Sequence, residues 1–483
     1  MNKGSRLCKR LLCNQQLKLK DLQYYLWLSV LVLAFLGLSI KVSGRSILAY
    51  RLLLPVFIGL SLRNYPLLFK RYNQLKDAVF LRRYDQFLIF WFAWAVASLL
   101  WVRSYTAAFR NIYYLFLGIL FIIFMQVFHG GERGKALYLN LFTVLSIAFF
   151  AFGYYELITG NHIPKSIFFN AERVDLRHRV TSFFINPNDF GAFASLFIWL
   201  FYIQTERLPK RWAKVCFAFI FSASSLILIV TTSRASILAF MMQVGILLLL
   251  NVGEIVMKLP GSIKRSIATL VFAFCFLYVN TLTNYGIYNG RILRLAETVK
   301  LAIESIFTKD GESEFSLRES QQQIIDMIED FGVEKTSSNT RLNIIKNSLL
   351  MLKDSRFLGV GAGNFETYME EYRETHYKVS KTNAHNWWME VLVNYGLPVF
   401  LIYLALYLWL LWRLLVIYLK SAKEGDLFPR ALSKGFLLML IGFVLSSISP
   451  SSIMGMRTIW IAFGLIISFV FYYDVVKQNR VEA

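Results

Sequence analysis

The sequence predicts an all-α polytopic membrane protein with about twelve transmembrane helices and a large extracytoplasmic helical loop between helices 9 and 10. Three observations lead to this fold class. Of the 483 residues, 56% are hydrophobic and 17% are charged, whereas soluble proteins average roughly 45–50% apolar and about 25% charged residues. The apolar residues form long uninterrupted runs, and lysine and arginine concentrate on one side of the membrane that these runs would cross.

The apolar runs are long enough to be transmembrane helices. A helix needs about 20 apolar residues to cross a hydrocarbon core of roughly 30 Å. Twelve runs approach this length: residues 22–40, 46–62, 84–101, 109–128, 136–158, 190–204, 213–230, 237–251, 267–282, 397–419, 431–449 and 456–475. The chain therefore divides into residues 1–282 with helices 1–9, residues 283–385 as the large loop, and residues 386–483 with helices 10–12.

The basic residues predict which side of the membrane each connection faces. Lysine and arginine concentrate in cytoplasmic loops, and here they fill the two tails and every second connection. The connection between the second and third runs alone carries Arg63, Lys70, Arg71, Lys76, Arg82 and Arg83, and later inner connections include Lys135 and Lys434. Both termini are therefore expected in the cytoplasm, with the large loop outside.

The formal net charge of +22 does not indicate a nucleic-acid partner. Residues 283–385 hold 13 basic and 15 acidic residues, so the large loop is close to neutral. The excess of positive charge lies mainly on the predicted inner rim of the membrane helices, where anionic lipid headgroups attract it. The predicted partner of these charges is the bilayer.

The second half of the large loop has a clear helical pattern. Leu342, Ile345, Leu349 and Leu352 recur every three or four residues, as one apolar face of a helix requires, and Ser338 or Asn339 can cap its start. The glycines of LGVGAGNF (358–365) then predict a tight turn, followed by a second helix over about 365–376. A dinucleotide-binding loop is rejected because no βαβ unit surrounds these glycines.

Two polar groups near the predicted outer ends of helices are candidates for chemistry. Arg234 lies between the seventh and eighth runs, and an arginine at the bilayer centre costs roughly 2.5–3.5 kcal/mol. An arginine that only extends to the interface is an equal alternative, and Arg51 and Arg110 are similarly ambiguous. His385 lies at the start of the helix leading into the tenth run, where the helix dipole disfavours imidazolium, although an interfacial histidine is the simpler interpretation.

Two local features adjoin these candidates. In the string RHRVTSFFINPNDFG, Asn186 can cap a helix, Pro187 suits its first position and Asp189 its positive first turn. This account leaves Arg179 and its neighbour Arg177 unexplained. Further on, Gly396 and Pro398 can break the tenth helix and hold His385 above the hydrocarbon.

Four strings in this order resemble the O-antigen ligase and polymerase superfamily, which includes O-antigen ligases, O-antigen polymerases and teichuronic acid polymerase-like proteins. They are RVTSFFINPNDFGAF at 179–193, VTTSRASILAF at 230–240, TRLNIIKNSLLMLKDSRFLGVGAGNF at 340–365 and NAHNWWMEVLVNYGLPVFLIYL at 383–404. The resemblance and the predicted topology cover essentially the whole chain. Ser182 stands where glycine is common in the family, and Arg356 where proline is common.

The resemblance implies a membrane glycan transferase of cell-surface polysaccharide biosynthesis, with its active site on the extracytoplasmic side of the cytoplasmic membrane. It implies a glycan donor carried on polyprenyl (undecaprenyl) diphosphate, with a flippase and a chain-length regulator of the same pathway as further partners. By motif, His385 becomes the catalytic residue, and Arg234 and Arg341 bind the diphosphate. Additional candidates for substrate binding lie in the same strings: Arg179, Asn186, Asn188 and Asn386.

These residue types fit the implied chemistry. Arginines hydrogen-bond phosphate oxygens in pairs as charge builds on the departing diphosphate, while His385 takes the proton of the acceptor hydroxyl. Attack in line would invert the anomeric centre. The sequence has no Asp-x-Asp pair of the kind that holds a metal in nucleotide-sugar enzymes, so the hypothesis is a metal-independent glycosyltransferase without a cofactor.

Several alternatives remain open at this point. A polymerase and a ligase share all four strings, and the basic composition favours the polymerase only weakly. A transporter or flippase of lipid-linked sugars belongs to a different class. It is disfavoured because the spans carry few acidic residues and the polar groups gather on one side, which suits chemistry on one side better than alternating access. A receptor or scaffold would not need arginines at the outer interface.

Overall fold

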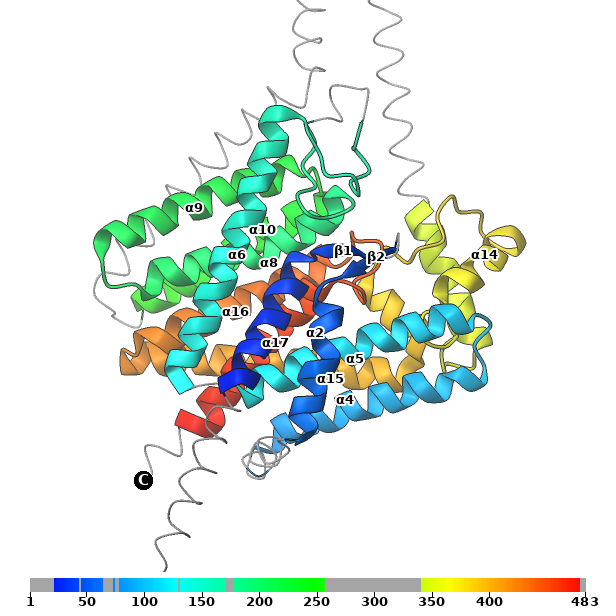
Figure 1. The fold of residues 1–483 in the computed structure, drawn as a ribbon, viewed down its shortest axis with the longest axis horizontal. Helices are drawn as coiled ribbons and strands as arrows, with labels where there is room; N and C mark the ends of the chain where they lie inside the picture. Colours follow the sequence, from blue (N-terminus) through cyan, green and yellow to red (C-terminus); the bar gives the residue numbers. More distant parts are fainter. Residues whose placement is uncertain are drawn as a thin grey trace, which may run out of the picture.

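The computed structural model describes residues 21–42, 45–63, 73, 78–128, 131–170, 178–256 and 340–477. Within these residues the protein is almost entirely helical (Figure 1). Several predicted features lie outside the described residues: the ninth span at 267–282, the first half of the large loop up to residue 339, the caps Ser338 and Asn339, and Arg177.

The described elements follow the predicted order with shifted ends. A helix over residues 21–36 leads into a hairpin of β1 (Ser39–Val42) and β2 (Arg45–Leu48), whose antiparallel register pairs Ser39 with Leu48. The first part continues with α2 (Tyr50–Arg63), α4 (Val79–Ala97), η1 (Ser98–Leu100), α5 (Tyr105–Val127), α6 (Gly131–Thr159), α8 (Pro187–Arg207), α9 (Arg211–Val230) and α10 (Arg234–Val256). The second part has a helix over residues 340–354, α14 (Phe365–Thr375), α15 (Trp387–Glu424), α16 (Leu427–Ser446), α17 (Arg457–Phe471) and the π-helical turn η2 (Tyr472–Lys477).

Seven of the described helices are long and apolar enough to cross a membrane. They are α5, α6, α9, α10, α15, α16 and α17. The helix at 21–36 and helices α2, α4 and α8 coincide with predicted spans but do not meet the same standard of length and apolarity. The all-helical membrane class is therefore confirmed, whereas the count of twelve spans and the position of the large loop remain predictions.

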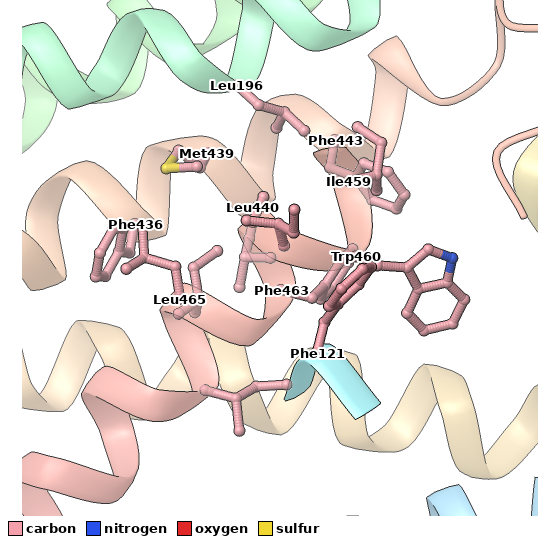
Figure 2. Close-up of a cluster of buried hydrophobic side chains, with 14 of the residues drawn as sticks. Phe121, Leu196, Phe436, Met439, Leu440, Phe443, Ile459, Trp460, Phe463 and Leu465 are labelled. Carbon is pink, nitrogen blue, oxygen red and sulfur yellow. The ribbon is translucent and has the colours of Figure 1, made fainter. Parts of the chain in front are cut away.

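Helix α8 lies inside the bundle. Every side chain from Phe190 to Gln204 is buried, and α8 packs against α16, α9 and α10. Beside it, side chains of α16 and α17 interdigitate with Leu196 of α8 and Phe121 of α5 (Figure 2). In a bilayer, helices associate through close packing rather than through the hydrophobic effect. Gly118 of α5 allows such packing, because an added Cβ there would lie 2.2 Å from the indole of Trp460 in α17.

Two lysines assigned to inner connections lie instead within helices. Lys135 of α6 and Lys434 of α16 are each about 1% exposed. Lys135 donates to the hydroxyl of Ser468 at 2.9 Å, and Lys434 donates to the amide oxygen of Asn251 at 2.5 Å. The prediction that these residues belong to the exposed inner rim is wrong, because the helices extend beyond their apolar runs and buried hydrogen bonds satisfy the ammonium groups.

One end of the bundle gathers the connections that carry the candidate residues. There the indole of Trp101 donates to the carbonyl of Gly359 at 3.0 Å, and the amide of Trp387 donates to Ser447 at 3.0 Å. Figure 1 shows α14 beside the ends of α4 and α5 at this place. We call this end the loop end, and it includes the connections at 98–104, 231–233, 355–386 and 447–456.

Candidate functional site

The glycine turn fixes the second half of the large loop to the loop end. Gly359, Gly361 and Gly363 have φ angles of +90°, +96° and +65°, which glycine adopts without a Cβ penalty. The amides of Val360 and Gly361 donate to carbonyls of α15, those of Val393 at 2.8 Å and Asn394 at 3.0 Å. The predicted turn is confirmed, and it also ties the preceding helix to α15.

Helix α15 breaks where the sequence suggested. Gly396 has φ +75° and ψ 180° inside the helix, and the amide of Leu397 donates to the carbonyl of Phe357 at 3.0 Å. A Cβ at Gly396 would lie 2.4 Å from backbone atoms of residues 357 and 358. The kink of α15 and the glycine turn therefore pack backbone against backbone, and this contact sets the position of the helix at 340–354.

The predicted apolar face of the helix at 340–354 is largely wrong. Leu342, Ile345 and Leu349 are exposed, and of the predicted set only Leu352 is buried. The buried face instead includes two polar residues, Asn347 and Ser348, beside the apolar Ile344 and Met351. Asn347 can be buried because its side chain exchanges two hydrogen bonds with the backbone of Tyr377, at 2.8 and 3.2 Å. The spacing of leucines alone could not reveal this partner.

His385 lies just before α15 in a strained and partly enclosed position. Its φ is +45°, a left-handed conformation that clusters at functional sites. Its Nδ1 atom lies 3.4 Å from the carbonyl oxygen of Ser449. Burial lowers the pKa of His385, and the positive charges of Lys381 and Arg341 lower it further. The ring is therefore neutral at pH 7, with Nδ1–H directed at Ser449 and Nε2 left as the proton acceptor.

Ser449 links His385 to the start of α10. Its hydroxyl lies 3.1 Å from that of Ser233, the residue before Arg234. Arg234 is the first residue of α10 and is exposed, and Thr232 before it has φ +57°. The connection at 447–456 thus touches both the histidine loop and the arginine turn.

Arg341 lies in the described second half of the predicted large loop. It lies in the first described turn of the helix at 340–354, is exposed, and acts electrostatically on His385. The structure therefore relates His385 to Arg341 through charge and to the turn of Arg234 through Ser449. The assignment of catalytic and diphosphate-binding roles to these three residues stays a prediction.

Two of the further substrate-binding candidates are helix caps. Asn186 accepts from the amide of Asp189 at 2.9 Å at the start of α8, as the NPND string predicts. Asn386 caps α15 by accepting from the amides of Trp388 and Met389. Their side-chain oxygens are therefore already engaged in the fold.

The other two candidates, Asn188 and Arg179, do not cap a helix. Asn188 is half-buried in the first turn of α8. Arg179 is also half-buried, and its Nε atom is buried without a hydrogen-bond partner among the described residues. Binding of substrate by any of the four stays a prediction.

The family departures at Ser182 and Arg356 are conformational. Both residues have positive φ, +49° and +52°. At Ser182 this explains why glycine suits the position, and the serine compensates with a hydrogen bond to the carbonyl of Phe149 at 2.8 Å. At Arg356 a proline could not adopt the observed φ.

The connection at 447–456 was missed by sequence reasoning. Glu390, buried one turn into α15, accepts from the hydroxyl of Ser452 at 2.6 Å and from the amide of Ile453 at 3.3 Å. These bonds hold the connection beneath His385. The signal was available, because SSISPSS at 446–452 puts five serines at the end of a predicted span, where polar residues usually have a function.

Two cavities adjoin this connection, and Ser452 and Gly455 line both. The first, the Glu390 cavity, has a volume of about 270 Å³ and is also lined by Arg110 and by Ala384 next to His385. The second, of about 270 Å³, is lined by Lys165 and other residues considered below. The first cavity is lined by polar side chains and by Ala384, and so adjoins the loop that carries His385.

Comparisons with known proteins find two similar sequences. Residues 217–404, which include Arg234, Arg341 and His385, match the O-antigen ligase family. The chain is also 26% identical over 399 residues to the teichuronic acid biosynthesis protein TuaE of Bacillus subtilis (strain 168), a match that covers 82% of this chain and 72% of that protein. These matches confirm the resemblance to the O-antigen ligase and polymerase superfamily.

Proposed function

We propose that this protein is a membrane glycosyltransferase that polymerises glycan repeat units carried on polyprenyl diphosphate, at the outer face of the cytoplasmic membrane. The observation that carries the proposal is the neutral, strained His385, which Ser449 orients and the charge of Arg341 reaches, within the region that matches the O-antigen ligase family. The matches support a polymerase or ligase type of transferase, and the choice of polymerase follows the likeness to a teichuronic acid biosynthesis protein.

In the proposed mechanism His385 is the general base. Because Nδ1–H points to the carbonyl of Ser449, Nε2 accepts the proton of the acceptor hydroxyl. The hydroxyl oxygen attacks the anomeric carbon of the donor, and the bond from that carbon to the diphosphate oxygen breaks, with its electron pair leaving on the polyprenyl diphosphate. General base catalysis of this kind contributes typically 10²–10⁴-fold.

The proposed role of Arg234 and Arg341 is to bind the diphosphate. Arg234 begins α10, so its guanidinium group is joined there by the positive end of a helix dipole, and Arg341 lies in the first described turn of the helix at 340–354. Charged hydrogen bonds to phosphate contribute on the order of 1.5–3 kcal/mol each, and they strengthen as charge builds on the leaving group. We propose a metal-independent mechanism, because the two guanidinium groups would neutralise the diphosphate that a metal ion holds in other transferases.

The pH dependence of transfer tests the role of His385. The base works only when neutral, so the rate rises with pH through the pKa of His385, whose value lies below the ordinary histidine value. Replacing Lys381 by Met removes a positive charge that disfavours imidazolium. The pKa of His385 rises, and the acidic limb of kcat/KM moves to higher pH.

The matched control is Lys378→Met. Lys378 is exposed and lies three positions before Lys381, but it is not among the charges that lower the pKa of His385. Its pH profile should coincide with that of the unaltered protein. Coincident profiles for the Lys381 and Lys378 variants would contradict the assignment of the acidic limb to His385.

Reconstitution decides between the candidate functions. We expect the purified protein in liposomes, given a polyprenyl-diphosphate-linked repeat unit, to produce lipid-linked chains of increasing length. Transfer of the glycan only to a different acceptor lipid would identify a ligase. Translocation without covalent change would identify a transporter and overturn the proposal. A flippase and a chain-length regulator are proposed partners in cells and are left out of this assay.

A further inference from the structure

The second of the two cavities at the 447–456 connection is lined by two cationic side chains and has no role in the mechanism above. It has a volume of about 270 Å³, and among the described residues its charged lining side chains are Lys165, Asp189 and Arg457. Because Ser452 and Gly455 line this cavity as well as the Glu390 cavity, the two adjoin across the connection at 447–456. We call it the Lys165 cavity.

Its two cations come from different elements and lie close together. Lys165 belongs to the connection after α6, and Arg457 is the first residue of α17. Burial lowers the pKa of Lys165, and the charge of Arg457 lowers it further, so the two groups repel each other. Arg457 is held by the carbonyl of Ala34 at 3.0 Å and lies over the ring of Tyr50. Neither partner is anionic, so the positive charge at the cavity is not neutralised by them.

The carboxylate in the cavity is only half satisfied. Oδ2 of Asp189 accepts from the amide nitrogen of Asn186 at 2.8 Å. Oδ1 is buried without a well-formed hydrogen bond among the described residues, and the backbone amide of Ser451 lies near the carboxylate. A buried carboxylate oxygen with incomplete hydrogen bonding can accept a hydrogen bond from a bound hydroxyl.

The remaining walls suit a sugar. Phe149, Phe183 and Phe184 line the same cavity, and aromatic rings pack well against the apolar faces of a pyranose. Two cations suit an oxyanion, and Oδ1 of Asp189 suits a sugar hydroxyl. The volume is near the lower end of small-ligand pockets, which hold roughly 300–1,000 Å³, so the cavity has room for about one sugar.

We propose that the Lys165 cavity binds a sugar bearing an oxyanion, either a carboxylate or a phosphate, on the glycan that accepts the transferred chain. This rests on the proposed function, in which Arg234 and Arg341 hold the donor diphosphate and leave the second pair of cations for the other substrate. The adjoining cavities then bring the two glycans together at the connection beneath His385.

Titration of three probes into the full-length protein in zwitterionic nanodiscs tests the site. The probes are glucuronate, glucose 1-phosphate and neutral glucose, followed by calorimetry. We expect at least one anionic sugar to bind about tenfold or more tightly than glucose. Lys165→Met should weaken that binding about tenfold or more, since one charged contact is lost, while Lys165→Arg retains it.

Retained binding in Lys165→Arg beside weakened binding in Lys165→Met excludes a merely structural effect. Preference for glucuronate or for glucose 1-phosphate identifies the carboxylate or the phosphate as the natural group, and either supports the site. Equal binding of glucose, or insensitivity to Lys165→Met, overturns it.

A further variant separates this site from the proposed function. Arg341→Gln should leave anionic-sugar binding unchanged, and loss of binding in that variant would place the probe at the diphosphate site instead and overturn the proposal. Retained binding with no transfer activity in the unaltered protein would leave the Lys165 site standing while the proposed function fails.

Discussion

Replacing His385 by Ala should reduce glycan transfer by about 10²–10⁴-fold, the usual contribution of a general base. The donor should still bind, because its diphosphate is assigned to Arg234 and Arg341. The loss should therefore appear in kcat, with KM for the lipid-linked donor little changed. The measurement is single-turnover chain elongation in liposomes with the purified variant.

The matched control is the exposed His376, whose ring stacks on Tyr372 with centroids 4.9 Å apart. His376→Ala removes the same side chain from the same segment without touching Ser449, and its transfer rate should match that of the unaltered protein. A correctly inserted His385→Ala protein with full activity would contradict the base assignment. A loss confined to KM would instead make His385 a binding residue.

The features that sequence reasoning predicted are those with local causes. The cap and first turn of α8 follow from Asn186, Pro187 and Asp189 within four residues, and the break of α15 follows from the single glycine Gly396. The glycine turn at 359–363 was likewise read from composition alone. In each case neighbouring residues determine the backbone, so no distant contact was needed.

The features that it missed depend on distant contacts. The helix at 340–354 buries Asn347, because the backbone of Tyr377 satisfies its amide. Ser449 lies in a connection with no residue of obvious chemistry, yet it contacts both His385 and Ser233. The role of Ser449 depends on these two partners, and His385 lies 64 positions and Ser233 lies 216 positions before it in the chain.

The candidate site is therefore formed by segments that lie far apart in the sequence. His385 is oriented by the 447–456 connection, and Glu390 holds that connection from inside α15. The glycine turn attaches the helix of Arg341 to α15, and the charge of Arg341 lowers the pKa of His385. The contact between this turn and the kink of α15 should therefore matter for catalysis as much as for stability.

Gly396→Ala tests that contact. The substitution places a Cβ at φ +75° and 2.4 Å from backbone atoms of residues 357 and 358. Gly425→Ala is the matched control, because Gly425 has φ +72° but no atom lies within 4 Å of an added Cβ. Gly425 has ψ 15° and lies in the left-handed helical region, where a side chain costs about 1–2 kcal/mol. Gly396 has ψ 180° and lies in a region almost confined to glycine, so the difference between the two variants combines this greater backbone strain with the overlap, which adds about 1–3 kcal/mol.

The expected result separates stability from function. Gly425→Ala should lower the thermal denaturation midpoint modestly and keep the transfer rate. Gly396→Ala should lower the midpoint further and reduce transfer about tenfold or more even well below that midpoint, because a displacement of roughly 1 Å at a reacting group can cost 10²-fold. Equal rates for the two variants would show that the glycine turn does not position Arg341 and His385 for transfer.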